Sequence, residues 1–191
     1  MGGSLPSFSL DGRGCVHFLF GGYPMKNRSR LLAYGALIGA MYAALTHLQN
    51  LLIPGSASFA IQFRASEALA VLAFFTPAAI PGLSVGCFVF NLTFSGALPL
   101  DPIVGTLATL LSCFAMWKLR KLPWLGLMMP ALFNAFLVGW ELTAYIGEAF
   151  WLNALYVAVG EAVVLYTLGA LLYTTMKKNG LARRLFGETA C

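Results

Sequence analysis

Long apolar stretches, separated by short polar breaks, run along most of the chain and predict helices over residues 31–53, 67–80, 82–94, 101–117, 124–146 and 151–176. Pro54 and Gly55 stop the first helix, and Pro77 and Pro81 mark a tight turn after the second. Asp101 precedes a proline, which is typical of a capping carboxylate followed by proline at the first helical position. A bilayer crossing needs about 20 apolar residues, so we expect an all-α bundle of six transmembrane helices.

The basic residues fall into three groups that give this bundle an orientation. The groups are Lys26, Arg28 and Arg30; Lys118, Arg120 and Lys121; and Lys177, Lys178, Arg183 and Arg184. Short loops rich in Lys and Arg stay in the cytoplasm. The first and second groups are separated by four predicted helices and the second and third by two, so all three can lie on one side. We therefore expect a multi-pass protein with both termini in the cytoplasm.

Composition supports a membrane protein, because 59% of the 191 residues are hydrophobic and only 10% are charged. A soluble domain is nearer a quarter charged. The formal net charge of +5 reflects orientation and does not indicate a nucleic-acid site. The cysteines have no metal-ligand spacing, and the chain lacks the phosphate-loop, H-E-x-x-H and G-x-S-x-G motifs. We expect no cofactor, no metal, no catalysis and no ATP hydrolysis by this chain itself.

The two ends differ from the apolar middle. Residues 25–178 are expected to form the membrane domain, and residues 179–191 a cytoplasmic tail. Residues 1–24 are Gly-rich and lack the order of a signal peptide. We expect them to be a disordered extension, or sequence upstream of a true start at Met25.

Ionisable and amide side chains inside the predicted helices are the candidates for a binding site. Placing a charged group inside a bilayer costs free energy, so each such residue is a candidate for a functional role. These groups are Glu67, Glu141 and Glu161, accompanied by Asn91, Asn134 and Asn153. Asn134 and Glu141 share one face of the fifth helix, and Asn153, Tyr156 and Glu161 share a broad face of the sixth. The alternative is that these groups only join helices by hydrogen bonds.

Arg64 is the one basic residue between the first two groups, and it lies one helical turn before Glu67. Three acids against one arginine leave an excess of acceptors, which suits a cation or a solute rich in N–H donors. Trp140 and Tyr156 could stack on a flat ring, although Trp and Tyr also favour membrane interfaces. Residues 55–66 form the longest predicted loop, which we interpret as a mobile lid on the outer side.

The first helix carries small residues at Gly35, Ala36, Gly39, Ala40, Ala43 and Ala44. Such spacing lets helix backbones approach closely. The stripe either packs inside this chain or docks another membrane protein.

Two longer motifs carry a resemblance to a known family. Residues 61–67 read IQFRASE and residues 150–161 read FWLNALYVAVGE. Together with Ala36 and Ala40 in the first helix, and Asn134 with Glu141 in the fifth, they resemble the queuosine precursor transporter family, QueT, over about residues 25–178.

The resemblance implies a substrate-binding S-component of an energy-coupling factor transporter in a bacterial cell membrane. It implies a six-helix fold, a transmembrane coupling subunit that docks on Ala36, Ala40 and Ala44, and two cytosolic ATPase subunits. The implied cargo is a 7-deazaguanine in cyano or aminomethyl form, or queuine. Its binding residues would be Glu161, Glu141, Asn153, Glu67, Arg64, Asn134, Asn91, Tyr156 and Trp140.

Two other functions are compatible with the same residues. A self-sufficient proton-coupled carrier would use Glu161 as its proton site. A membrane enzyme acting on lipid is the second alternative.

Overall fold

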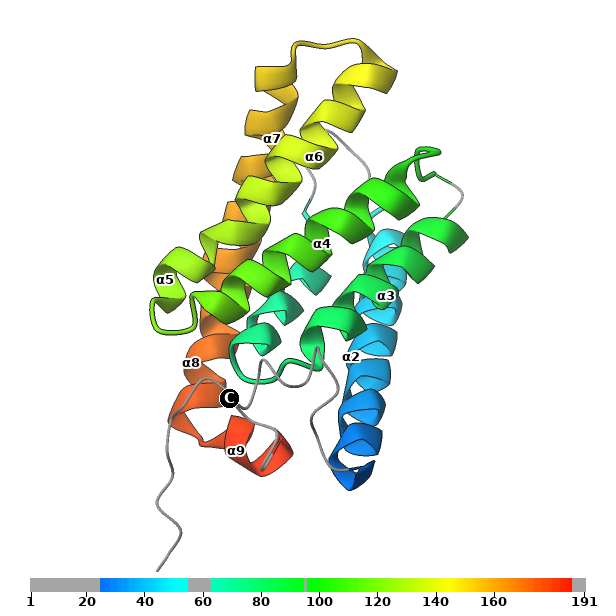
Figure 1. Ribbon diagram of the computed structural model, residues 1–191. Coiled ribbons are helices and arrows are strands. Elements are labelled where there is room, and N and C mark those ends of the chain that lie inside the picture. Colours follow the sequence, from blue (N-terminus) through cyan, green and yellow to red (C-terminus); the bar gives the residue numbers. More distant parts are fainter. Residues whose placement is uncertain (1–24, 55–62, 95, 187–191) are drawn as a thin grey trace, which may run out of the picture.

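The computed structural model describes residues 25–54, 63–94 and 96–186, and it is helical throughout with no strand in these ranges (Figure 1). The elements are α2 (Met25–Leu52), the 3₁₀ helix η1 (Ala65–Phe74), α3 (Ala79–Thr93), α4 (Asp101–Lys118), α5 (Pro123–Gly126), α6 (Met128–Ile146), α7 (Phe150–Val164), the π-helical turn η2 (Leu165–Gly169), α8 (Ala170–Lys178) and α9 (Leu181–Phe186). The predicted all-α fold class is confirmed over these residues. The extension 1–24 and most of the predicted lid, 55–66, lie outside the described residues.

Three helical stretches within the described ranges are long and apolar enough to cross a membrane: Arg28–Leu52, Pro123–Ile146 and Phe150–Lys178. The helices η1 and α3 are apolar but shorter. The number of crossings and the side on which the termini lie stay predictions.

The second predicted helix differs from its expected form. It is a 3₁₀ helix that ends at Phe74, whereas residues 67–80 were expected to be helical. A proline disfavours helical geometry in the residue before it, so Pro77 keeps Thr76 out of the helix, which ends earlier, at Phe74. The helix α3 then begins at Ala79, and Pro81 lies inside its first turn, where its missing N–H costs little. Ten residues in 3₁₀ geometry span about 20 Å, which gives this buried segment a longer reach than an α-helix would.

The fifth and sixth predicted helices are each interrupted. A break at Leu127 separates α5 from α6, and Pro130 in the first turn of α6 cannot donate a hydrogen bond back across it. The π-helical turn η2 joins α7 to α8 without a loop. The pattern of apolar residues had indicated neither interruption. Part of the predicted tail is also ordered, because the Phe186 ring of α9 packs on the Tyr34 ring of α2 with centroids 5.5 Å apart.

Glycines set the distance between neighbouring helices. Gly35 and Gly39 of α2 lie against Gly82 and Gly86 of α3, and a Cβ atom added at Gly82 would come within 2.4 Å of the Gly35 carbonyl oxygen. Similarly, a Cβ added at Gly139 of α6 would come within 3.0 Å of the α7 backbone. A side chain at these positions would clash with the neighbouring helix, so the two glycines of the predicted small-residue stripe pack inside the chain.

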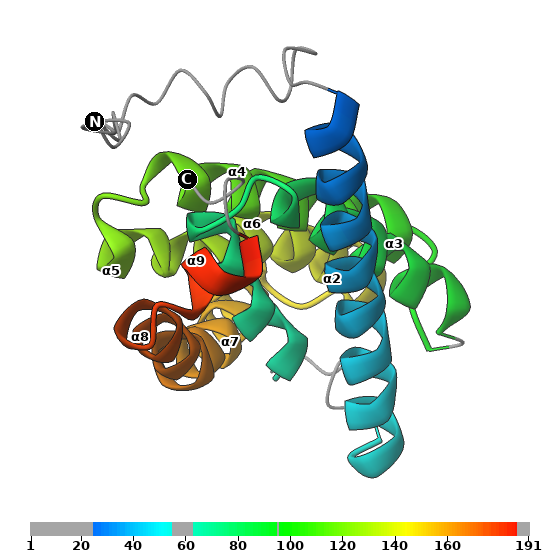
Figure 2. The same ribbon diagram turned by 90° about the horizontal axis from the view of Figure 1, so that it is seen from below.

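The short helix η1 lies at the centre of the bundle, in contact with α2, α3, α4, α7, η2 and α8. Figures 1 and 2 show α2 and α3 on one side of it and the long α6–α7 hairpin on the other. The start of α2 and the end of α8 lie at the lower end of Figure 1, and the α6–α7 turn lies at the upper end. Residues 65–74 therefore carry Glu67 into the interior, where side chains from the surrounding helices meet it.

Candidate functional site

Seven of the nine predicted binding residues are buried, with at most 6% of their surface exposed. They are Arg64, Glu67, Asn91, Asn134, Glu141, Asn153 and Glu161. Tyr156 is half-buried. Trp140 is 56% exposed on the outer surface of α6, so the structure does not bring it to the buried polar groups.

Glu161 of α7 is held by the amide of Asn134. The Asn134 Nδ2 group donates to Glu161 Oε1 at 2.9 Å, and no described residue donates to Glu161 Oε2. Both side chains are buried in the α6–α7 hairpin, whose helices are brought together at Gly139. One oxygen of the carboxylate is thus fixed, and the other is a buried acceptor to which no described residue donates.

Glu67 of η1 is held from the opposite side by α2. The Tyr42 hydroxyl, which is fully buried, donates to Glu67 Oε1. One and two turns further along α2, Thr46 donates to the Ser66 hydroxyl at 2.7 Å, and Gln49 accepts from the Ala65 backbone N–H at 2.7 Å. Three side chains on one face of α2 therefore fix the segment that carries Arg64 and Glu67.

Arg64 is the common electrostatic neighbour of the carboxyl groups. Its guanidinium interacts with Glu67 and Asp101, and also with Glu141 and Glu161. It also lies over the Phe90 ring of α3, 5.8 Å from the ring centroid. Four carboxyl groups from η1, α4, α6 and α7 thus share one cation in a buried setting, where uncompensated charge is costly.

Within the described part of the chain, no group donates a hydrogen bond to either carboxylate oxygen of Glu141, although none of its surface is exposed. Its strongest electrostatic neighbour is the Asp101 carboxyl group at the start of α4. The predicted capping role of Asp101 is wrong: its Oδ2 atom accepts from the Leu98 backbone N–H at 2.7 Å, and no described side chain caps α4.

Asn91 and Asn153 each have one buried oxygen without a partner. Asn91 Nδ2 donates to the Asp101 carbonyl oxygen at 3.0 Å, and Asn153 Nδ2 donates to Thr143 Oγ1 at 3.2 Å. The Oδ1 atoms of both residues accept no hydrogen bond from residues 25–54, 63–94 and 96–186. Unpartnered buried polar atoms are rare in native proteins, so each of these oxygens calls for a donor such as a water molecule or a ligand.

We call Arg64, Glu67, Asp101, Asn134, Glu141 and Glu161 the polar cluster. Sequence reasoning missed Asp101 as a member, because it was assigned to capping. It also missed Tyr42, although Tyr42, Thr46 and Gln49 are spaced as one polar face on an otherwise apolar helix. Among the described residues, no group of three or more His, Cys, Asp or Glu side chains is arranged to hold a metal ion.

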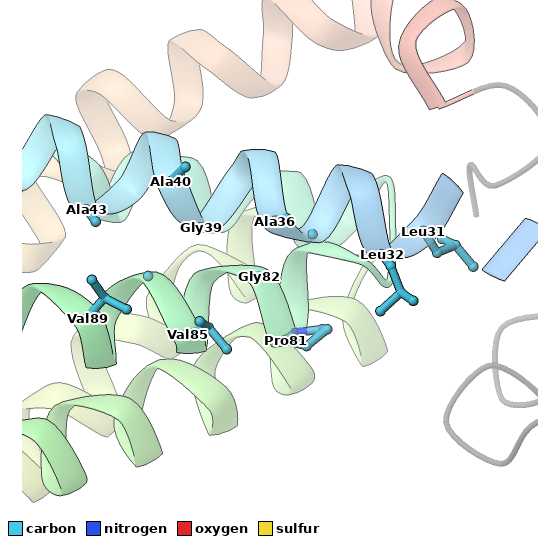
Figure 3. A pocket seen from close by; sticks show the side chains of 12 residues that line it. Leu31, Leu32, Ala36, Gly39, Ala40, Ala43, Pro81, Gly82, Val85 and Val89 are labelled. Atoms are coloured by element: carbon cyan, nitrogen blue, oxygen red, sulfur yellow. The ribbon is translucent and has the colours of Figure 1, made fainter. Parts of the chain in front are cut away.

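The outer side of α2 carries a second feature, an apolar groove of about 510 Å³ shared with α3 (Figure 3). Ala36, Ala40 and Ala43 line it from α2, opposite Val85 and Val89 of α3. Ala44 is exposed but does not line the groove, and Ala43 lies there in its place.

Comparison with known proteins agrees with these features. The model of the QueT transporter family matches residues 32–178, which include the polar cluster and the groove apart from Leu31. Searches of the curated proteins and of the solved structures gave no significant match. The match covers most of the chain and the apolar helices suit a bilayer, so the chain belongs to the QueT transporter family and is a membrane transport protein.

Proposed function

We propose that the chain is the substrate-binding membrane subunit of an energy-coupling factor importer, and that it captures a queuosine precursor at the polar cluster. Family membership supports transport, and the chemistry of the cluster supports the cargo. The observation that carries the proposal is the set of buried acceptors without donors on Glu141, Glu161, Asn91 and Asn153.

A 7-deazaguanine supplies the donors that this set lacks. Its N1–H and 2-amino groups form one edge that a carboxylate can accept in a bidentate pair. Glu161 offers that carboxylate, with Asn134 fixing its second oxygen. Asn91 and Asn153 would pair with other polar groups of the base. Half-buried Tyr156 would stack on the ring, whereas exposed Trp140 is not part of the proposed site.

The energy for transport would come from partner subunits. The chain has no phosphate-loop motif, so we propose that two cytosolic ATPases act through a transmembrane coupling subunit. The groove between α2 and α3 would take an apolar helix of that subunit, because alanines and glycines leave room for a close approach. In the proposed arrangement six segments cross a bacterial cell membrane, both termini are cytoplasmic, and the chain catalyses no reaction.

A stand-alone proton-coupled carrier is the second candidate. It is favoured by the surplus of buried carboxyl groups around Arg64, which one or more protons could balance. Uptake abolished by an uncoupler in cells without the ATPases would support this carrier. Uptake that requires the ATPases and the coupling subunit would support the importer.

Calorimetric titration of the purified chain tests the cargo. We expect tight binding of a 7-deazaguanine and none of unrelated vitamins. Binding of vitamins without binding of any deazaguanine would contradict the proposed cargo.

A further inference from the structure

One aromatic ring gathers two cations where α4 ends. The Lys118 Nζ atom lies 5.0 Å from the centroid of the Trp117 ring, and the Arg120 guanidinium carbon lies 5.7 Å from the same centroid. Lys118 also lies over the Phe114 ring, at 5.5 Å. A cation within about 6 Å of a ring centroid is attracted by the π-electrons. Because only 4% of Trp117 is exposed, its ring is a fixed support that keeps the two cations near each other.

The turn after α4 brings this charge to the surface. The Leu122 N–H donates to the Leu119 carbonyl oxygen at 2.7 Å, which closes a tight turn with Arg120 and Lys121 at its middle. Lys118 and Lys121 are exposed, and Arg120 is half-buried. The sequence contains no acidic residue between positions 101 and 141. Like charges close together disfavour one another, so the turn should attract an anion from outside the chain.

Large apolar side chains follow the turn directly. Leu122, Trp124 and Leu125 are 59%, 58% and 47% exposed. The short helix α5 is held in place, because the Tyr166 hydroxyl donates to the Trp124 carbonyl oxygen at 2.8 Å. Figure 1 shows α5 and the turn before it at the left edge of the bundle. An exposed tryptophan next to basic residues is typical of the boundary between acyl chains and water.

We propose that the turn between α4 and α5 binds an anionic phospholipid, with its phosphate between Lys118 and Arg120 and its acyl chains along the apolar side chains of residues 122–125. A phospholipid carries an anion and an apolar tail in one molecule, which matches the cations and the apolar surface together. A soluble anion or an acidic protein segment would use the cations and leave the apolar side chains uncovered. This site does not depend on the proposed cargo.

The test is lipid binding by the full-length purified chain in a neutral detergent, counted by native mass spectrometry. Phosphatidylglycerol is compared with phosphatidylcholine of the same acyl chains, and with glycerol phosphate, which has the anion without the chains. The wild type should bind phosphatidylglycerol about tenfold or more tightly than phosphatidylcholine, and should not bind glycerol phosphate. Lys118→Gln and Arg120→Gln should each weaken phosphatidylglycerol about fivefold, which is the contribution of one basic residue at an anionic membrane surface.

Lys178→Gln is the matched control. Lys178 is an exposed cation at the end of α8, so this substitution removes the same charge from a different helix and should leave both lipid affinities unchanged. Thermal unfolding in detergent checks that all three variants fold. If either Lys118→Gln or Arg120→Gln does not fold, the other serves.

Equal binding of both lipids by the wild type overturns the lipid site and favours an acidic protein segment at this turn. Tight binding of glycerol phosphate indicates a site for a soluble anion and also overturns the proposal. Folded Lys118→Gln and Arg120→Gln proteins that keep the wild-type affinity overturn the role of the two residues. A Lys178→Gln protein that loses as much affinity as they do overturns it as well, because the effect would then be one of net charge.

Discussion

At the scale of single residues, the sequence identified the carboxylates and amides of the interior correctly as buried groups, because charge inside an apolar helix is conspicuous. It could not identify their partners. Tyr42 was overlooked because tyrosine is common in membrane helices, and only the fold places its hydroxyl on Glu67, 25 positions away. Asp101 was overlooked because a carboxylate before a proline has a simple local explanation. Long-range contacts of this kind depend on the packing of helices, which a single sequence does not specify.

The Tyr42 hydroxyl gives a prediction at this scale. Tyr42→Phe keeps the ring and removes one donor from the buried Glu67 carboxylate. The free energy of unfolding should fall by about 1–3 kcal/mol, since a buried acceptor loses its partner. Thermal unfolding in detergent measures this change. Tyr145→Phe is the control, because Tyr145 is 46% exposed and should tolerate the change. Equal stability of both variants would show that the Tyr42 contact contributes little.

At the scale of elements, α2 has one face that contacts the interior and another that lines the outer groove. Tyr42, Thr46 and Gln49 hold the segment that carries Arg64 and Glu67, while Ala36 and Ala40 line the groove on the outside. The sequence predicted the small residues of this helix but left open whether they pack internally or dock a partner. Gly35 and Gly39 pack against Gly82 and Gly86 of α3, whereas the docking of a partner on Ala36 and Ala40 stays a prediction. The 3₁₀ geometry of η1 and the π-helical turn η2 could not be predicted, because both arise from packing around a buried segment.

Substitutions at the adjacent positions Gly39 and Ala40 of α2 should have different effects, the first on stability and the second on transport. Gly39→Ala would place a Cβ atom 2.5 Å from the Gly82 carbonyl oxygen, so the chain should lose about 1–3 kcal/mol of stability. Ala40→Leu projects into the groove and should leave stability and substrate binding unchanged, while transport is lost because the coupling subunit cannot approach. Thermal unfolding, ligand titration and uptake in cells with the complete transporter measure the three effects. Normal transport by Ala40→Leu would show that the groove is not the docking face.

At the scale of the whole molecule, the described parts of the basic groups lie away from the α6–α7 turn. Arg28 and Arg30 begin α2 and Lys177 and Lys178 end α8, at the lower end of Figure 1. This arrangement is what the positive-inside rule requires of a protein whose termini are cytoplasmic. The order of the apolar stretches was sufficient to predict a helical membrane protein. The helices η1 and α3 are apolar but shorter than the three stretches that could cross a membrane, and the number of crossings stays a prediction.

Cysteine labelling tests this orientation. In a background whose native cysteines are replaced by alanine, a cysteine at Glu148, in the α6–α7 turn, should react with an impermeant reagent added to intact cells. A cysteine at Lys121, in the basic loop, should react only after the cells are opened. The reverse pattern, or equal labelling of both positions from outside, would contradict the proposed topology.

The central claim is that the polar cluster binds a 7-deazaguanine. It is tested most directly by titrating wild-type and Glu161→Gln protein with that base. The glutamine can keep its oxygen on Asn134, so an NH₂ group replaces Glu161 Oε2 and opposes the donors of the base. We predict a folded variant that binds at least about tenfold more weakly, since hydrogen bonds to charged groups are worth about 1.5–3 kcal/mol. Folded Glu161→Gln protein that binds the base as tightly as wild type would contradict the account.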